Sequence, residues 1–168
     1  MTEPTEGAGP ASTEGAARAA AALAASGIPH TITRHGPVRS LAEAAAARGL
    51  SPADVIKTIV VRRADDDFLF VLVPGDRTIS WPKLRTLLGV SRLSMPDAAT
   101  AKDVTGYERG TITPFGSLRP WPVVADERVP GRAVSIGAGA HGVAATVAGD
   151  DLVSALRATV ADVTDPEA

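Results

Sequence analysis

One lysine stands inside a run of β-branched residues where a charge is out of place. Lys57 interrupts Val55–Val61, which otherwise has the composition of a buried strand. Because removing an ammonium from water is costly, a cationic lysine there needs a partner, a wet pocket or the anion of a substrate. Strand alternation places it on one face with three apolar residues, Val55, Ile59 and Val61. Lys57 is a candidate binding residue, and a solvated lysine whose stem covers apolar neighbours is the alternative.

A second candidate is a glycine-rich loop over Gly106–Gly116, which contains Gly110-Thr-Ile-Thr-Pro114. Glycine permits close backbone approach and positive φ angles, and proline stiffens the far end. Such a loop can direct N–H groups at an anion or a developing oxyanion. An ordinary turn between strands explains the same pattern.

The three histidines, His30, His35 and His141, match no standard zinc-binding spacing. His30 alternates within a predicted strand, where a surface or packing role is the default. His35 precedes a Gly-Pro turn, and His141 lies in the flexible segment 137–142, where a polar side chain can face a cleft. We therefore treat His35 and His141 as candidate site residues. No G-x-S-x-G nucleophile motif occurs.

Composition narrows the classes of function. The 168 residues are 45% hydrophobic, which is enough for the core of one domain. The net charge of −2 gives no global basic field, so DNA binding is not expected and any RNA contact must be local. The lack of cysteine excludes disulfides, thiolate catalysis and cysteine-ligated zinc. No apolar run approaches the roughly 20 residues of a membrane span, and the expected compartment is the cytoplasm.

The elements that must position these residues follow from periodicity and turn signals. Residues 1–13 are predicted to be a disordered tail, 14–160 a single domain and 161–168 a frayed end. Helices are predicted over 14–26, 41–48, 81–88, 96–103 and 149–160. Strands are predicted over 30–34, 55–61, 68–73, 91–95, 121–125, 133–136 and 143–147. Because several strands are joined by hairpin-length links, the fold class is α+β with a mixed, largely antiparallel sheet flanked by helices.

Three segments, in this order, resemble the YbaK/prolyl-tRNA synthetase-associated domain family: Val55–Val61, Thr105–Gly116 and Pro122–Glu127. The resemblance covers about residues 15–158. Members are trans-editing aminoacyl-tRNA deacylases, with relatives inserted in bacterial prolyl-tRNA synthetases. The resemblance implies a curved mixed sheet with a cleft over it, and neither a metal nor a cofactor.

The resemblance also implies a reaction, the hydrolysis of the ester between a wrong amino acid and the 3′-terminal ribose of a tRNA. The family's strand lysine corresponds to Lys57, which would bind the terminal phosphate or the ester region. The family's G-x-x-x-P loop corresponds to the segment whose residues are Gly110, Thr111, Ile112, Thr113 and Pro114. Its backbone would hold the carbonyl and amine of the substrate and help to place water, which makes Lys57 and Gly110 the expected catalytic residues. In the cysteine-editing branch the thiol of the substrate would assist.

Some positions depart from the family pattern. Many relatives have Ser-x-Gly-basic-basic-Gly and then an acidic residue near the C-terminal strands. Here Gly137 stands at the serine, Ala140 at one basic position and Ala144 at the acidic position. His35 falls near a pocket tyrosine of the cysteine-editing branch. Gly137, His35 and His141 are therefore expected to border the substrate, whose identity these changes leave open.

The expected function is release of a small mischarged amino acid (Cys, Ala or Ser) from tRNA, with tRNA(Pro) favoured. The partners would be the tRNA acceptor end and an aminoacyl-tRNA synthetase. The alternative is a module of the same fold that has lost catalysis and binds a tRNA end, a nucleotide or a synthetase. The third possibility is an unrelated small-molecule hydrolase, but the sequence shows neither a catalytic nucleophile nor a set of metal ligands that would support it.

Overall fold

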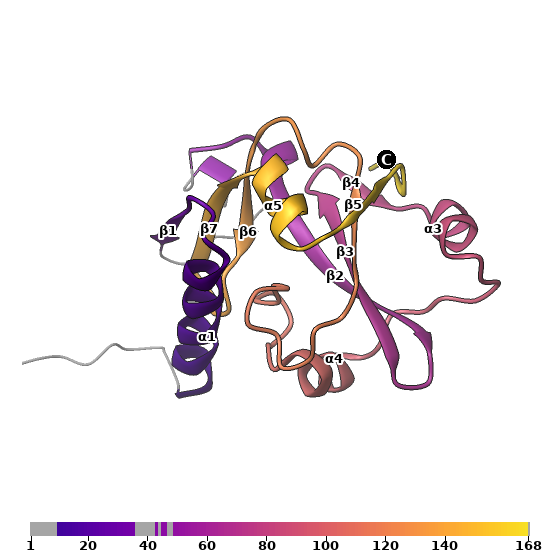
Figure 1. The fold of residues 1–168 in the computed structure, drawn as a ribbon, viewed down its shortest axis with the longest axis horizontal. Helices are drawn as coiled ribbons and strands as arrows, with labels where there is room; N and C mark the ends of the chain where they lie inside the picture. The colour runs from indigo at the N-terminus through magenta and orange to yellow at the C-terminus, as the bar shows by residue number, and fades with distance from the viewer. Residues whose placement is uncertain (1–9, 36–42, 44, 47–48, 168) are drawn as a thin grey trace, which may run out of the picture.

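The computed structural model describes residues 10–35, 43, 45–46 and 49–167, and its main feature is a seven-stranded mixed sheet (Figure 1). In spatial order the strands are β1 (Thr31–Arg34), β7 (Val143–Ala148), β6 (Ala133–Gly137), β2 (Val55–Ala64), β3 (Asp67–Pro74), β5 (Val123–Asp126) and β8 (Thr159–Ala161). The longest ladders, β2 with β3 and β6 with β7, are antiparallel, whereas β6–β2, β3–β5 and β5–β8 are short and parallel. The predicted fold class is confirmed.

The hairpin of β2 and β3 is the longest ladder in the sheet and was predicted from the acidic turn between two apolar runs. Asp66 adopts a φ of 55° in that turn, a left-handed conformation that aspartate tolerates better than most residues. The ladder runs from Ile56 opposite Pro74 to Ala64 opposite Asp67. This hairpin fixes the direction and the faces of the strand that carries Lys57.

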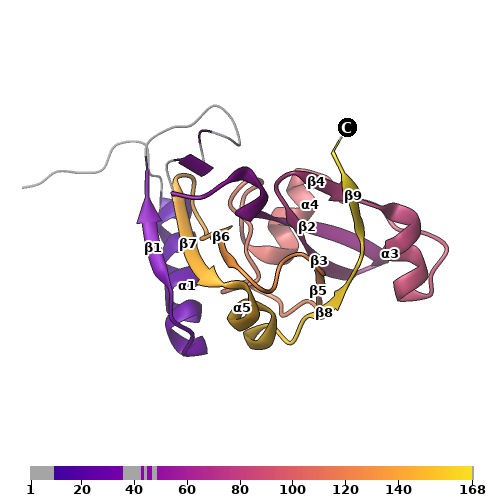
Figure 2. The same ribbon diagram turned by 90° about the horizontal axis from the view of Figure 1, so that it is seen from above.

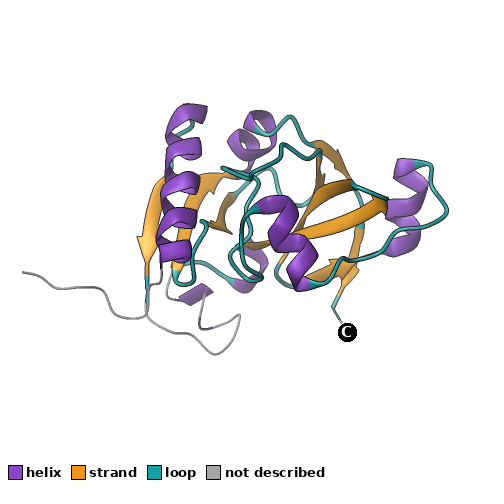
Figure 3. Ribbon diagram, turned by 90° about the horizontal axis from the view of Figure 1, so that it is seen from below, coloured by secondary structure: helices purple, strands orange, loops and turns teal. Residues whose placement is uncertain are grey.

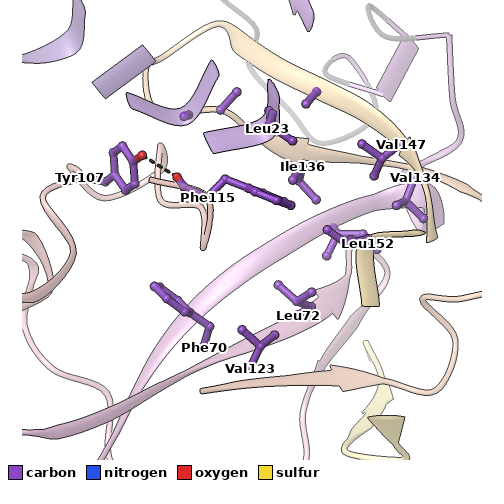
Figure 4. Close-up of a cluster of buried hydrophobic side chains, with 14 of the residues drawn as sticks. Leu23, Phe70, Leu72, Tyr107, Phe115, Val123, Val134, Ile136, Val147 and Leu152 are labelled. Atoms are coloured by element: carbon purple, nitrogen blue, oxygen red, sulfur yellow. Dashed lines mark hydrogen bonds between the residues drawn. The ribbon is translucent and has the colours of Figure 1, made fainter. Parts of the chain in front are cut away.

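The two faces of the sheet bury separate apolar clusters. Ile56 and Val60 of β2 belong to the larger cluster, which includes side chains of α1 (Pro10–Ser26), α4 (Ala98–Thr105) and α5 (Gly149–Ala155). Figure 4 shows part of this cluster, with Leu23 of α1 and Leu152 of α5. Val61 and its neighbour Ile59 belong to the second cluster, under α3 (Trp81–Leu88) and the C-terminal segment. The predicted alternation along β2 is therefore confirmed. Figures 1 and 2 show α1 and α3 at opposite ends of the sheet.

Local capping explains where two helices begin. Ser80 caps α3, accepting a hydrogen bond from the backbone N–H of Lys83, and Gly89 ends the helix in a left-handed conformation, as predicted. The next helix was predicted to begin at Pro96. It begins instead at Ala98, because the carboxylate of Asp97 accepts the backbone N–H of Thr100 and makes Asp97 the N-cap.

Other predicted boundaries were wrong. Helix α1 begins at Pro10 and not at residue 14. The strand predicted over 91–95 is a single bridge between Ser94 and Arg62. Most of the helix predicted over 41–48 lies outside the described residues.

The C-terminal segment also differs from the prediction. Helix α5 ends at Ala155, and residues 159–161 form β8 instead of continuing the helix. The tail that was predicted to be frayed from residue 161 contains β9 (Thr164–Pro166), which pairs with β4 (Arg77–Ile79) as a second, two-stranded sheet (Figure 2). The buried Asp126 accepts hydrogen bonds from the N–H of Val163 and the hydroxyl of Thr164, which anchors this segment.

Candidate functional site

A cleft of about 640 Å³ opens where β6 leaves the edge of β2. The parallel pairing of these strands reaches only to Ile56 opposite Ile136, and the edge of β2 next meets another segment at Arg62, which pairs with Ser94. Between those points the strand edge forms the floor of the cleft. The described residues that line it are Val55–Val60, Met95–Ala98, Ala101, Arg109, Gly110, Ile112 and Gly137. Figure 3 shows α4 and the loops that surround this region from below.

Lys57 lines this cleft, and the second sheet orients it. Its Nζ donates a hydrogen bond to the carbonyl of Arg77 on β4 at 2.8 Å and lies 4.0 Å from a carboxylate oxygen of Glu167. Its side chain is 34% exposed. A three-donor ammonium that is held by one carbonyl and one distant carboxylate keeps donor capacity for a further acceptor.

The glycine-rich loop forms the opposite wall. Gly110 is exposed at a φ of 89°, and Ile112 lines the cleft and packs on the larger core. Thr111 and Thr113 are buried away from the cleft, where their hydroxyls hold the loop: Thr111 donates to the carbonyl of Glu108, and Thr113 accepts the N–H of Phe115. The loop therefore contributes the backbone of Gly110 to the cleft, while the hydroxyls of Thr111 and Thr113 stabilise the conformation of the loop.

The segment after β6 borders this loop. A β-carbon added to Gly110 would lie 3.5 Å from Cε1 of His141, and one added to Gly137 would lie 3.4 Å from the carbonyl oxygen of Ile112. The N–H of Gly139 donates to the carbonyl of Thr111 at 3.1 Å. Gly137 thus lines the cleft, and the exposed His141 stands at its rim beside Gly110.

Two predicted positions lie apart from the cleft wall. The N–H of His35 donates to the carbonyl of Gly142 at the end of β1, and His35 is not among the residues that line the cleft. Pro114 also lies outside the lining and accepts a hydrogen bond from the N–H of Ser117. Ala144 is buried on β7 opposite Gly137, so the departure at this position is next to the cleft.

Sequence reasoning missed Thr58. It lines the cleft on the face of β2 that Ile56 and Val60 share, and its Oγ1 is buried with no hydrogen-bond partner among the described residues. A buried hydroxyl without a partner is costly, so a group that enters the cleft can supply the missing hydrogen bond. The signal in the sequence was a single hydroxyl on an otherwise apolar strand face.

The cleft combines two cations and one carboxylate. Lys57 and Arg109 carry the positive charges, and Asp97 the negative one. The hydrogen bonds from Thr100 to Asp97, the backbone one first, hold the pKa of that carboxyl below its usual range. No group of three or more histidine, cysteine, aspartate or glutamate side chains in the described residues is placed to hold a metal ion. The arrangement suits an anionic ligand whose polar centre meets backbone N–H groups.

The motifs and the geometry agree with a comparison against known families. Residues 35–155 match the family described as the aminoacyl-tRNA editing domain. The chain belongs to this family. The match includes the cleft lining, and it confirms the resemblance that the motifs around Lys57 and Gly110 indicated.

Curated relatives of this editing domain are much longer proteins. Residues of the chain are 34% identical over 93 positions to the proline–tRNA ligase of Bacillus licheniformis, covering 55% of this chain and 16% of the ligase. They are 40% identical over 80 positions to that of Heliobacterium modesticaldum, covering 48% of this chain and 14% of the ligase. The chain thus spans about a sixth of the length of these relatives.

Solved structures share the fold over nearly the whole editing domain. The hypothetical protein APE2540 has a TM-score of 0.80 at 26% identity, covering 88% of this chain and 99% of that protein. A candidate trans-editing enzyme for prolyl-tRNA synthetase has a TM-score of 0.81 at 23% identity, covering 94% and 98% of the two chains. No helix among the described residues is both long and apolar enough to cross a membrane.

Proposed function

We propose that this editing domain hydrolyses the ester between a small mischarged amino acid (Cys, Ala or Ser) and the 3′-terminal ribose of tRNA, with tRNA(Pro) as the preferred substrate. The observation that carries the proposal is the cleft that brings Lys57 and the Gly110 loop together in a member of this family. The proline–tRNA ligases among the relatives support the choice of tRNA(Pro). The cytoplasm, where charged tRNA is used, is the compartment that goes with this reaction.

The proposed reaction needs groups that bind the substrate and groups that polarise its ester carbonyl. Water attacks the ester carbonyl carbon, the bond to the ribose oxygen breaks, and that oxygen takes up a proton, which leaves a free amino acid and a tRNA with a free hydroxyl. The ammonium of Lys57 would hold the terminal phosphate or the ester region. Backbone N–H groups around Gly110 would stabilise the oxyanion that forms on the carbonyl. The hydroxyl of Thr58 would accept from or donate to the substrate.

The size of the cleft fits this substrate class. About 640 Å³ lies within the usual range of small-ligand pockets and leaves room for a terminal nucleotide with a small side chain. Larger side chains would be excluded sterically. Discrimination among small ones is weak when it rests on size, because one methylene is worth about 1–3 kcal/mol.

A second candidate function is a binding module that has lost catalysis. Gly137, Ala140 and Ala144 lack the polar side chains expected from the family pattern; Ala140 and Ala144 are buried, and Ala144 lies opposite the cleft-lining Gly137. Such a module would hold a tRNA end, a nucleotide or a synthetase. Binding of tRNA without release of any amino acid would select this candidate.

The test is release of labelled amino acid from a panel of mischarged tRNAs, with Lys57→Ala beside the parent protein. Loss of one charge-assisted hydrogen bond should lower kcat/KM by about 10- to 150-fold. A raised KM alone would assign Lys57 to the phosphate, and a lowered kcat would assign it to the ester. Lys102→Ala is the matched control, because Lys102 is exposed on α4 outside the cleft lining. Undiminished activity of Lys57→Ala would remove the lysine from the mechanism.

A further inference from the structure

A single arginine on α1 holds both ends of the glycine-rich loop. Nε of Arg18 donates to the carbonyl of Gly116 at 3.1 Å, and Nη2 donates to the carbonyl of Gly106 at 2.8 Å. These carbonyls lie ten residues apart in the chain, so the guanidinium fixes the distance across the base of the loop. Arg18 precedes the matched segment 35–155 and lies outside the three segments that carry the family resemblance.

The two ends of the loop are shaped for this contact. Gly106 has a φ of 82°, and a β-carbon there would lie 2.7 Å from Nη2 of Arg18. Gly116 has a φ of 76°, and its β-carbon would lie 2.6 Å from the carbonyl oxygen of Arg18. A side chain at Gly106 would displace Leu118 or Arg18, and one at Gly116 would displace Tyr107 or the backbone of α1. The loop thus carries glycine where α1 approaches.

A buried tyrosine extends the contact into the loop. The Cζ atom of Arg18 lies 4.7 Å from the centre of the Tyr107 ring, and the Tyr107 hydroxyl donates to the carbonyl of Phe115 at 2.6 Å (Figure 4). Burial raises the pKa of Tyr107, so the hydroxyl stays protonated and able to donate. The loop is therefore tied across its base by Arg18 and across its interior by Tyr107.

We propose that Arg18 is a positioning residue of the editing loop: by fixing Gly106 against Gly116 it sets where the backbone around Gly110 faces the cleft. For its effect on rate this inference rests on the proposed deacylase function. Arg18 forms no ion pair with any carboxylate among the described residues, and its guanidinium contacts the two loop carbonyls and the Tyr107 ring. The planar guanidinium of arginine presents N–H donors in fixed, separate directions and can reach two separated carbonyls at once. The ammonium of a lysine is compact, so it cannot bridge them in the same way.

The experiment compares Arg18→Ala and Arg18→Lys with Leu23→Ala in the full chain. Leu23 is buried on the same helix and belongs to the larger core, so Leu23→Ala weakens the packing of α1 while the guanidinium of Arg18 keeps its two donors to the loop carbonyls. We expect both Arg18 variants to lose about 10- to 100-fold in kcat for amino acid release, with KM for tRNA unchanged, since small misplacements of reacting groups have effects of this size. Millimolar guanidinium should restore part of the rate of Arg18→Ala and none of that of Leu23→Ala.

Amide hydrogen exchange supplies a readout that does not need activity. Arg18→Ala should speed exchange in residues 107–116 more than Leu23→Ala does, and it should leave the β2–β3 hairpin unchanged. Wild-type kcat in Arg18→Ala, or equal kcat losses in Arg18→Ala and Leu23→Ala without guanidinium rescue, would overturn the inference. If the parent protein releases no amino acid from any tRNA, the proposed function fails, and loop exchange alone then decides whether Arg18 positions the loop.

Discussion

Gly110 allows the sharpest separation of stability from function, through the substitution Gly110→Ala. The residue has a φ of 89°, and an added β-carbon would meet nothing closer than Cε1 of His141 at 3.5 Å. The cost is therefore conformational and not steric. A side chain in a left-handed conformation costs about 1–2 kcal/mol. For a chain of this size that lowers Tm by about 2–8 °C.

The chain contains a matched control for this substitution. Gly131 has the same φ of 89°, and an added β-carbon there has no atom within 4 Å. It lies in the turn between β5 and β6, outside the cleft lining. Gly131→Ala should therefore lose about as much stability as Gly110→Ala and keep its activity.

The two variants should differ in amino acid release. Relief of strain at Gly110 moves backbone that faces the cleft, and a displacement of about 1 Å can lower kcat by about 100-fold. Thermal unfolding and single-turnover release from mischarged tRNA, measured well below both Tm values, separate the effects. If Gly110→Ala keeps the parent rate, or if Gly131→Ala loses as much rate, the assignment of the loop to catalysis is wrong.

Two further predictions concern other parts of the molecule. Thr58→Val removes a buried hydroxyl that has no hydrogen-bond partner in the described part of the chain, so the free energy of unfolding in urea should rise by about 1 kcal/mol while amino acid release falls; a loss of stability would show that the fold itself uses the hydroxyl. Asp162 accepts hydrogen bonds from Lys83 and Arg128, which hold its pKa below the ordinary value. Its carboxylate therefore contributes stability above its unfolded pKa of about 3.9, and that contribution is lost as the pH falls through the lower folded pKa. Asp162→Asn should be less stable than the parent at pH 7, with a difference that shrinks in denaturation curves below about pH 4, and a difference independent of pH would contradict this reasoning.

The sequence predicted the features that depend on neighbouring residues. Alternation in β2 placed Lys57 correctly relative to Ile59 and Val61, and the acidic turn located the hairpin. Gly110 was singled out because glycine and proline mark unusual backbone. The groups that contact Lys57 and Gly110 belong to segments far away in the sequence. Local sequence patterns therefore could not predict these contacts.

The misses have the same physical origin. Residues 161–168 were predicted to be a frayed tail, yet the buried Asp126, 38 positions upstream of Thr164, anchors this segment. In the sequence, Thr58 is indistinguishable from any other strand threonine. Whether its hydroxyl has a hydrogen-bond partner in the described structure depends on where distant segments such as β6 lie. The backbone N–H of His35 joins the end of β1 to Gly142, and the role of its side chain at the substrate stays a prediction.

The order of strands has a consequence for any shortened form of the protein. Both outer strands of the large sheet, β1 and β8, come from residues outside the segment 35–155 that matches the family. A protein cut to that segment would expose β7 and β5 as new edges, with rows of unpaired backbone N–H and C=O groups. Such edges template self-association. The same cut removes α1, whose Ala16, Ala19 and Leu23 belong to the larger core, so precipitation of a trimmed protein would report lost edge protection together with lost packing. A monodisperse protein therefore needs a longer stretch of chain, with β1 and β8, than the segment 35–155 that matches the family.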